Sequence, residues 1–344
     1  MDDTHPTSLS DIVGWDIGGV NIKAARRKKE GWQVVQQPIA IWQQREELVS
    51  ILTDISARLG PAEQTAITIT AELSDAFRTK REGIAFVLDA VQAAWPDTRL
   101  YIFGVDGRFH DLATARADHM LVAAANWLAT ARVVARRFAD CLLVDVGSTS
   151  TDVIPIKDGQ VAAQGRNDPE RLLRGELLYT GALRTPVFAI TPRVPLWGGW
   201  CPVAAELFAT AQDMHLLLGS LSLAQCTAPS ADGRAVTPEF AGERLARVVC
   251  ADREMLSDAE IRGIAQYIAA EQVRQIARAI AQVISTARVE GPVVAVGVGI
   301  FLAQAAAGQL GLDCILPTTL WDNGAATVAP AAAVALLLDE QSCV

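Results

Sequence analysis

Two segments share a pattern that decides the fold: residues 13–23 read VGWDIGGVNIK, and residues 142–154 read LLVDVGSTSTDVI. In each segment an apolar run reaches an aspartate, Asp16 or Asp145, turns through small residues and resumes as a second apolar run. Such a hairpin exposes backbone N–H groups, and glycine allows a phosphate to approach them closely. The aspartate is placed to hold a hydrated divalent cation against that phosphate. The repetition predicts an internal duplication that places two phosphate-binding loops face to face.

The composition indicates a globular protein with room for two domains. Of the 344 residues, 51% are hydrophobic and 20% are charged, so each domain can bury its own core. The net charge of −9 argues against nucleic acid as a partner. The six cysteines include no C-x-x-C pair, which argues against a zinc site and a disulfide scaffold. Without an apolar signal segment or a membrane-spanning stretch, we expect a cytoplasmic protein that makes no membrane contact.

Alternating strand-like and helix-like runs predict an α/β fold with two lobes. We expect the first lobe at residues 1–138 and the second at 139–344, each beginning with a three-stranded meander. An insertion at about residues 167–252, rich in proline and tryptophan, interrupts the second lobe, and only one helix, at 202–218, is predicted within it. The other expected strands are 11–16, 20–26, 32–39, 66–70, 99–104, 141–146, 152–157, 160–164, 293–297 and 314–316, and the other expected helices are 45–59, 83–95, 119–131, 257–288, 300–310 and 325–339.

The first hairpin carries residues suited to phosphate. Gly18 and Gly19 permit a tight turn, and Asn21 and Lys23 share one face of the following strand. The lysine would neutralise phosphate charge, and the asparagine amide would donate to a phosphate oxygen. The alternative is a plain tight turn with an exposed lysine.

The second hairpin carries hydroxyl groups as well as carboxylates. Gly147 is followed by Ser148, Thr149 and Thr151, and then by Asp152. Hydroxyls and backbone amides suit phosphate oxygens, and carboxylates suit Mg²⁺ or a bridging water. The alternative is a Ser/Thr-rich turn that caps its own backbone.

A third element, at residues 293–299, ends an apolar strand in Gly297 and Gly299 before a helix, and would present N–H groups to an anion or a nucleotide. The order of the three elements resembles the actin-like ATPase superfamily of sugar kinases, Hsp70-type chaperones, actin and hydantoinase/oxoprolinase proteins. This resemblance implies two RNase H-like lobes whose paired hairpins clamp phosphates, with the G-x-G junction near the adenosine of a nucleotide.

Longer stretches resemble a narrower family: GWDIGGVNIKAA at 14–25, DVGSTSTDVIPI at 145–156 and RLLRGELLYTGALRTPV at 171–187. This family comprises the hydantoinase-like proteins of tetrahydromethanopterin-linked one-carbon metabolism, whose archaeal members serve methanofuran biosynthesis. The resemblance implies a transferase that joins an aminomethylfuran methyl diphosphate to the phenol of γ-glutamyltyramine and releases diphosphate. In bacteria that use methylofuran, a tyrosine-based acceptor is the expected counterpart.

For this reaction we expect Asp16 and Asp145 to position Mg²⁺, and Lys23, Ser148 and Thr149 to bind diphosphate. A furan carbinyl carbon ionises readily, so catalysis needs a leaving group held by a cation and N–H donors, together with a positioned phenol. ATP is compatible with such loops but is not required.

The candidate base for the phenol is Glu72, just past a predicted strand end, where kinases of the superfamily tend to carry theirs. The alternative is a glutamate favoured by the dipole at a helix N-terminus, and Asp152 is the second candidate base. The candidate acceptor-binding residues lie in the insertion, where Arg184 would pair with a carboxylate or, alternatively, brace the loop. The full set is Arg174, Glu176, Tyr179, Arg184 and Thr185.

Two other classes of function remain open on the sequence. One is an ATP-dependent hydrolase or small-molecule kinase, because all three nucleotide-type elements are present. The other is a noncatalytic actin-like scaffold, and homo-oligomeric assembly is compatible with either class.

Overall fold

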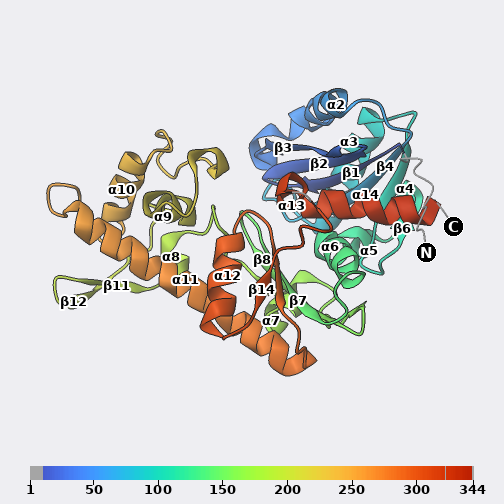
Figure 1. Ribbon diagram of the computed structural model, residues 1–344. Helices are drawn as coiled ribbons and strands as arrows, with labels where there is room; N and C mark the ends of the chain where they lie inside the picture. The colour runs from blue at the N-terminus through green and yellow to red at the C-terminus, as the bar shows by residue number, and fades with distance from the viewer. Residues whose placement is uncertain (1–10, 322, 343–344) are drawn as a thin grey trace. The chain divides into compact units, whose positions relative to one another are not determined.

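The computed structural model describes residues 11–321 and 323–342 (Figure 1). The chain divides into two compact units. Among the described residues, the first unit contains 11–137 and the segment from 317 onward, and the second contains 138–316.

The first unit is built on a mixed sheet in the order β3-β2-β1-β4-β5-β6. β1 pairs antiparallel with β2 and parallel with β4, so a meander is followed by a crossover strand. The strands are β1 (Ile12–Gly18), β2 (Asn21–Lys28), β3 (Gly31–Pro38), β4 (Gln64–Thr70), β5 (Arg99–Phe103) and β6 (Phe109–His110). The helices are α1 (Ile41–Gln44), the 3₁₀ turn η1 (Arg45–Glu47), α2 (Leu48–Leu59), α3 (Lys80–Ala94), α4 (Leu112–Ala117), α5 (His119–Val122), α6 (Asn126–Ala135), α13 (Asn323–Thr327) and α14 (Ala329–Ser342).

The two faces of β1 have different neighbours because successive side chains point to opposite sides of a strand. Val13, Trp15 and Ile17 belong to the same buried cluster as the apolar faces of α2 and α3. Full burial of such a side chain contributes about 1.5–3 kcal/mol. On the other face, a Cβ at Gly14 would lie 2.0 Å from the carbonyl oxygen of Ala331. Glycine is therefore needed where α14 crosses β1.

The second unit repeats the strand order of the first. Its sheet runs β10-β8-β7-β13-β14, with β9 also paired to β8. β7 is antiparallel to β8 and parallel to β13. The strands are β7 (Cys141–Val146), β8 (Thr151–Lys157), β9 (Gln160–Val161), β10 (Leu177–Leu178), β13 (Val293–Val296) and β14 (Cys314–Ile315), with helices α11 (Asp258–Ala287) and α12 (Ile300–Gln309). The shared order, a meander continued by parallel strands, confirms two RNase H-like lobes.

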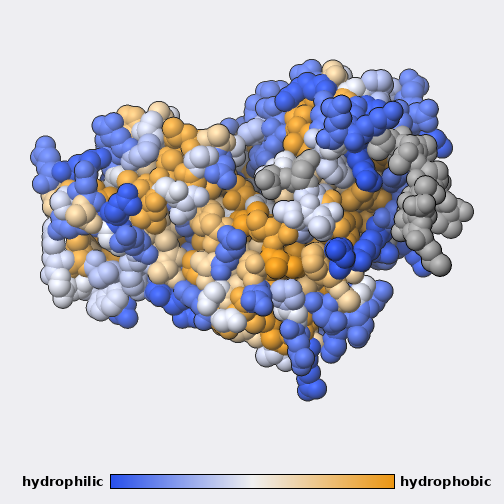
Figure 2. All heavy atoms as spheres, viewed as in Figure 1, coloured by the Kyte–Doolittle hydropathy of each residue, from blue (hydrophilic) through white to orange (hydrophobic). Residues whose placement is uncertain are grey.

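Helices α11 and α12 share a buried cluster with one face of the second sheet. α12, with the sequence IFLAQAAAGQ, buries one face through Leu302, Ala303, Ala306 and Ala307 and exposes the opposite face, as expected for a helix packed on one side of a sheet. Figure 2 shows hydrophobic residues gathered over this part of the second unit. Within the residues the structure describes, no helix combines the length and apolar character needed to cross a bilayer.

The insertion forms a second cluster of buried residues around the N-terminal part of α11. The insertion contains the elements between α7 and α10 along the chain, and the two-stranded ribbon β11–β12 extends from it (Figure 1). The elements are α7 (Asp168–Arg174), α8 (Val187–Ile190), β11 (Arg193–Leu196), β12 (Gly199–Pro202), α9 (Ala211–Leu218), the 3₁₀ turn η2 (Leu223–Gln225) and α10 (Pro238–Arg247).

Several predicted elements match the structure closely. The meanders and the parallel strands of both sheets lie where expected, and Ser257 with Glu260 forms the predicted capping box of α11. The predicted helix at 202–218 is wrong in its first half, because Thr210 and Asp213 form a capping box that starts α9 at Ala211. The predicted helix at 119–131 is broken, since Ala124 adopts a φ of 50° and its N–H donates to Ile69 at the end of β4.

The predicted membership of the C-terminal helix in the second lobe is also wrong. α14 packs on β1 and α6 of the first unit, and residues from Pro317 onward belong to that unit. The physical reason is the close approach at Gly14, which only a strand without a side chain at that position allows.

Candidate active site

The first group of polar side chains lies on the β1–β2 hairpin. Asp16 stands opposite Lys23 in the antiparallel register, and the Lys23 Nζ lies 3.6 Å from the Asp16 Oδ2. Thr70, at the end of β4, donates from its hydroxyl to the Asp16 Oδ1 over 3.2 Å. Asp16 and Lys23, two of the predicted site residues, are therefore in contact.

The surroundings of Asp16 are unusual for a carboxylate because the residue is only 4% exposed. Burial raises the pKa of Asp16 above its ordinary value of 3.8, since desolvation outweighs the charge of Lys23 and the hydrogen bonds from Thr70 and Lys23. Such a carboxylate is stabilised by any further positive charge, whether a proton or a metal cation. The side chain of Lys23 is 22% exposed, so the alternative of a plain turn with an exposed lysine is wrong.

The turn between β1 and β2 packs against the loop that follows β4. A Cβ on Gly18 would lie 2.8 Å from the carbonyl oxygen of Asn21, which is itself almost buried at the start of β2. A Cβ on Gly19 would lie 3.6 Å from the Cβ of Ser74. The loop after β4 therefore lies beside the turn, as a base acting near bound phosphate would require.

Glu72 lies in this loop and is 2% exposed. Its Oε1 lies 3.4 Å from the Nζ of Lys80, a residue that the sequence did not single out. α3 begins at Lys80 with Thr79 as its N-cap, so Glu72 lies outside the helix. Its backbone nevertheless packs against Gly83 in the first turn of α3, so the interpretation as a glutamate favoured by the helix dipole stays open beside that of a base.

The β7–β8 turn, residues 147–150, is held by residues 180–185. The carbonyl oxygen of Gly147 accepts a hydrogen bond from the N–H of Ala182 at 2.9 Å. The carbonyl oxygen of Ser148 accepts hydrogen bonds from the N–H groups of Leu183 and Arg184 at 3.1 and 2.9 Å. Three backbone hydrogen bonds thus fix the carbonyl side of the turn. This arrangement differs from a turn that only caps its own backbone.

The hydroxyl side of the same turn is more open. Ser148 and Thr149 are intermediate in exposure, and their two hydroxyl oxygens lie 3.5 Å apart. Gly181 approaches the turn closely, since a Cβ there would lie 2.6 Å from the backbone of Thr149. The turn can therefore offer two adjacent hydroxyls to an anion while its backbone is held rigid.

The G-x-G junction after β13 lies against the end of β7. The N–H of Gly299 donates to the carbonyl oxygen of Val146 over 2.9 Å. Gly297 has a φ of 90°, and a Cβ there would lie 2.5 Å from the Asp145 Oδ1. The structure thus brings the junction and the second hairpin together, with the Asp145 carboxylate between them.

Asp152 stands opposite Asp145 in the β7–β8 register. Its Oδ1 lies 2.9 Å from an Nη of Arg171, which is 2% exposed and was not among the predicted site residues. Thr151 donates from its hydroxyl to the carbonyl oxygen of Thr180 over 2.6 Å. These contacts join β8 to the insertion. The carboxylate of Asp152, the second candidate base, is therefore paired with Arg171.

Three of the predicted acceptor-binding residues lie close to the turn in sequence and structure. The Thr185 Oγ1 accepts from the N–H of Gly181 at 2.8 Å and also donates to its carbonyl oxygen, so it closes its own loop. Arg184 is half-buried; burial lowers the pKa of its guanidinium, and the nearby Tyr179 opposes that shift. Tyr179 is 60% exposed. Arg184 and Tyr179 thus remain candidates for contact with an acceptor.

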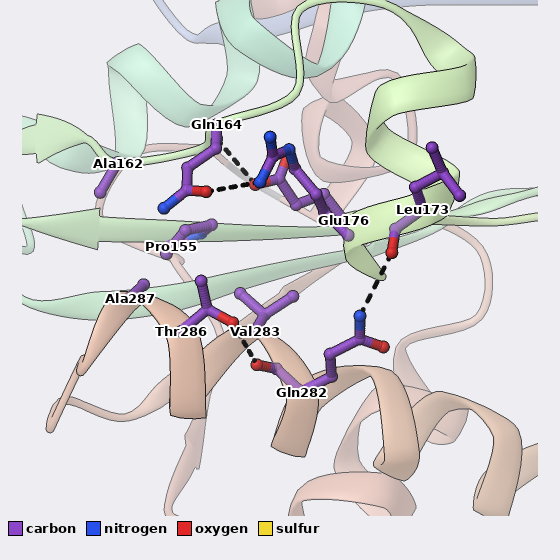
Figure 3. Close-up of a pocket in the computed structure, with 10 residues that line it drawn as sticks. Pro155, Ala162, Gln164, Leu173, Glu176, Gln282, Val283, Thr286 and Ala287 are labelled. Carbon is purple, nitrogen blue, oxygen red and sulfur yellow. Dashed lines mark hydrogen bonds between the residues drawn. The ribbon is translucent and has the colours of Figure 1, made fainter.

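The other two predicted acceptor residues line a separate pocket of about 190 Å³ between α7, β8 and α11. Both carboxylate oxygens of Glu176 accept backbone N–H groups, from Gln164 and Gly165. Arg174 donates to the side-chain oxygen of Gln164 over 2.6 Å. Figure 3 shows Gln164 and Glu176 facing the α11 residues that line the other side of the pocket. The structure therefore does not bring Arg174 and Glu176 to the β7–β8 turn.

Residues 63–341 match the hydantoinase/oxoprolinase family. The chain belongs to this family. A curated relative from Methanocaldococcus jannaschii is 34% identical over 331 residues, which cover 96% of this chain and 98% of the relative. That protein is named (4-{4-[2-(gamma-L-glutamylamino)ethyl]phenoxymethyl}furan-2-yl)methanamine synthase.

A second family relative, from Methanococcus vannielii, carries the same name and is 36% identical over 126 residues, covering 37% of this chain and 56% of the relative. Among solved structures, component A of (R)-2-hydroxyglutaryl-CoA dehydratase from Acidaminococcus fermentans aligns with a TM-score of 0.48 and 12% identity, covering 97% of this chain and 99% of that one.

The carboxylate of each hairpin suits a metal ion that is bound together with a phosphate-containing substrate. Across the described residues, no group of three or more His, Cys, Asp or Glu side chains is placed to hold a metal ion. Mg²⁺ commonly takes only one or two carboxylates, together with waters and substrate phosphates. Within the second unit, Asp145, which is partly exposed beside Gly297, is consistent with that mode. Within the first unit, so is Asp16, which pairs with Lys23.

Proposed function

We propose that this chain is a transferase that joins an aminomethylfuran methyl diphosphate to the phenol of a γ-glutamyltyramine or tyrosine acceptor. The observation that carries the proposal is 34% identity across 96% of the chain to a synthase whose named product contains a phenoxymethylfuran. The phenoxymethyl group is an aryl ether, the bond such a transferase would make. The reaction would be a step in the synthesis of methanofuran or methylofuran for one-carbon metabolism.

The reaction exchanges one carbon–oxygen bond for another. The bond between the furan carbinyl carbon and the diphosphate oxygen breaks, and its electron pair leaves with diphosphate. The phenol oxygen forms the new bond to the same carbon, and its proton passes to a base. Because positive charge develops on the furan and negative charge on diphosphate, groups that stabilise the leaving group contribute most to the rate.

In this proposal the β7–β8 turn binds the diphosphate through the hydroxyls of Ser148 and Thr149. Their position on a turn whose carbonyl side is fixed by three backbone hydrogen bonds supports the assignment, because preorganised donors need no rearrangement during reaction. Asp145 would hold Mg²⁺, whose charge would offset that of the diphosphate. In the first unit, Asp16 and Lys23 form the corresponding candidate site on the β1–β2 hairpin.

Glu72 is the proposed base for the phenol proton. Its support is its place in the loop that lies beside the β1–β2 turn, with the Nζ of Lys80 3.4 Å from its carboxylate. Asp152, whose carboxylate pairs with the buried Arg171, is the second candidate. Arg184 is the proposed partner of an acceptor carboxylate, the group present in both γ-glutamyltyramine and tyrosine.

The test is turnover with purified protein, Mg²⁺ and the furan diphosphate, offered in parallel with γ-glutamyltyramine, tyrosine and tyramine. We expect ether product, measured by mass spectrometry, in a one-to-one ratio with released diphosphate. A separate incubation with Mg²⁺ and ATP addresses the hydrolase or kinase alternative. Phosphate release from ATP without any ether product would contradict the proposal.

A further inference from the structure

Three buried polar side chains lie behind the β7–β8 turn and have no place in the chemistry above. His215 of α9 is 1% exposed, Gln272 of α11 is 0% exposed, and Thr180, between β10 and α8, is 3% exposed. Polar groups buried to this degree are retained only where hydrogen bonds replace those lost to water. Their mutual contacts show what they hold in place.

Gln272 connects α11 to the segment that grips the turn. Its Nε2 donates to the Thr180 Oγ1 over 3.0 Å and to the Gly181 carbonyl oxygen over 2.9 Å. Because a carbonyl oxygen only accepts, these contacts fix which end of the amide is nitrogen. The Gln272 Oε1 therefore faces His215, at 2.8 Å from its Nε2.

His215 must donate from Nε2, since an amide oxygen only accepts. Burial lowers its pKa to about 4, so the ring stays neutral and keeps this proton at neutral pH. Its ring also meets Phe301 edge to face, with centroids 4.8 Å apart. Phe301 lies in the first turn of α12, which begins directly after Gly299.

The turn is thus held by two neighbouring segments that share one buried support. Residues 180–185 hold the carbonyl groups of Gly147 and Ser148, and Gln272 holds residues 180 and 181. The junction at Gly299 holds the end of β7, and His215 packs beside the helix that follows it. The Nδ1 of His215 has no hydrogen-bond partner among the described residues, whereas its Nε2 and both polar atoms of the Gln272 amide are paired. Paired buried groups of this kind favour one arrangement.

We propose that Gln272, oriented by His215, is a positioning residue that sets the β7–β8 turn in the conformation that binds diphosphate. It acts on the turn through Thr180 and Gly181 and makes no contact with the substrate itself. The inference rests on the proposed function only for the identity of the ligand. Its effect is expected on the affinity for diphosphate, the ligand that the turn itself binds.

The experiment measures binding of inorganic diphosphate with Mg²⁺ by calorimetry, using the full chain. Gln272→Leu removes three hydrogen bonds and is expected to weaken binding about tenfold to a hundredfold. Thr180→Val removes one hydroxyl from a nearly unchanged shape, and about threefold to tenfold weaker binding is expected. Thr180→Ser keeps the hydroxyl, and binding within about twofold of the unsubstituted protein is expected.

Turnover supplies the second readout. In Thr180→Val the KM for the furan diphosphate should rise, and Thr180→Ser should restore it. Equal diphosphate affinity in Thr180→Val and Thr180→Ser would overturn the inference, even if Gln272→Leu fails to fold. Failure of the unsubstituted protein to bind diphosphate would overturn it as well. Diphosphate binding that is lost in Thr180→Val, without ether formation by any protein, would support the inference and contradict the proposed reaction.

Discussion

The β1–β2 and β7–β8 hairpins share a strand order and an aspartate, yet they present different chemistry. Asp16 in the first is buried, paired with Lys23 and hydrogen-bonded by Thr70. Asp145 in the second is partly exposed and lies beside a glycine junction. The first hairpin concentrates charge in a buried position, and the second offers hydroxyls on a rigid turn.

Under the proposed function, this difference would let the two hairpins take different parts in the reaction. A buried ion pair and a nearby Glu72–Lys80 pair suit the control of protons and cations. A turn held at its carbonyl groups suits the recognition of an anion. Substitutions in the two units should therefore affect different kinetic constants, and four predictions test that division.

The largest effect is expected in the first unit. Glu72→Gln keeps the shape of the side chain but removes the base, and kcat should fall by about 10²–10⁴-fold. The KM for the furan diphosphate should stay the same. Glu63→Gln is the control, because its side chain is 75% exposed, and turnover should be unchanged. Full activity in Glu72→Gln would remove Glu72 as the base.

The next effect is expected where the second hairpin meets the glycine junction. Gly297→Ala places a Cβ about 2.4 Å from the Val146 carbonyl oxygen, so the end of β7 must shift, and a shift of this kind lowers activity by about 100-fold. Gly311→Ala is the matched control, since Gly311 also has a positive φ but no atom within 4 Å of the new Cβ. The steady-state rates of the two folded variants are compared. An equal loss of activity in both variants would contradict a special role for the glycine junction.

A smaller effect is expected from the hydroxyls of the turn. Ser148→Ala and Thr149→Val should each raise the KM for the furan diphosphate about tenfold, the scale of one hydrogen bond to a charged group. The acceptor KM should not change. Ser230→Ala serves as a control, because its hydroxyl bonds to Arg234 within the insertion. Rate losses without any change in KM would instead assign the hydroxyls to a later step.

The smallest effect is expected in stability rather than rate. The folded-state pKa of Asp16 is raised above 3.8 by burial, so the folded protein holds this proton more tightly than the unfolded chain. Protonation of Asp16 therefore adds to the free energy of unfolding below pH 3.8, and this addition is lost as pH rises through the folded-state pKa. Asp16→Asn should remove this part of the pH dependence, measured as the difference between urea unfolding curves from pH 4 to pH 8. Asp75→Asn, at an exposed position in the same unit, should keep it.

Much of the fold could be predicted because short sequence patterns mark the strands, turns and helix starts. The apolar runs that end in Asp16-Ile17-Gly18 and Asp145-Val146-Gly147, each followed by a second apolar run, predicted both meanders. The Ser257 capping box predicted the start of α11. The position of α14 could not be predicted, because an alanine-rich helix that is apolar from Ala329 to Leu338 fits either sheet. The one available signal was Gly14 within a buried strand, which indicates a close approach of another backbone.

The candidate site was predicted less completely, for a related reason. Gly-rich turns and their hydroxyls are visible as local motifs, whereas partners far apart in sequence are not. Lys80, Arg171 and Gln272 reach their partners through the tertiary fold. The same limit explains why Arg174 and Glu176, though near Arg184 in sequence, line another pocket.

The most direct test of the account follows the oxygen atom through the reaction. The acceptor is prepared with ¹⁸O in its phenol group and incubated with the furan diphosphate, Mg²⁺ and the protein. The account predicts that all of the label appears in the ether and none in the released diphosphate, because the carbinyl carbon is the atom attacked. Label found in a phosphorylated phenol, with no labelled ether, would contradict it and would show attack at phosphorus.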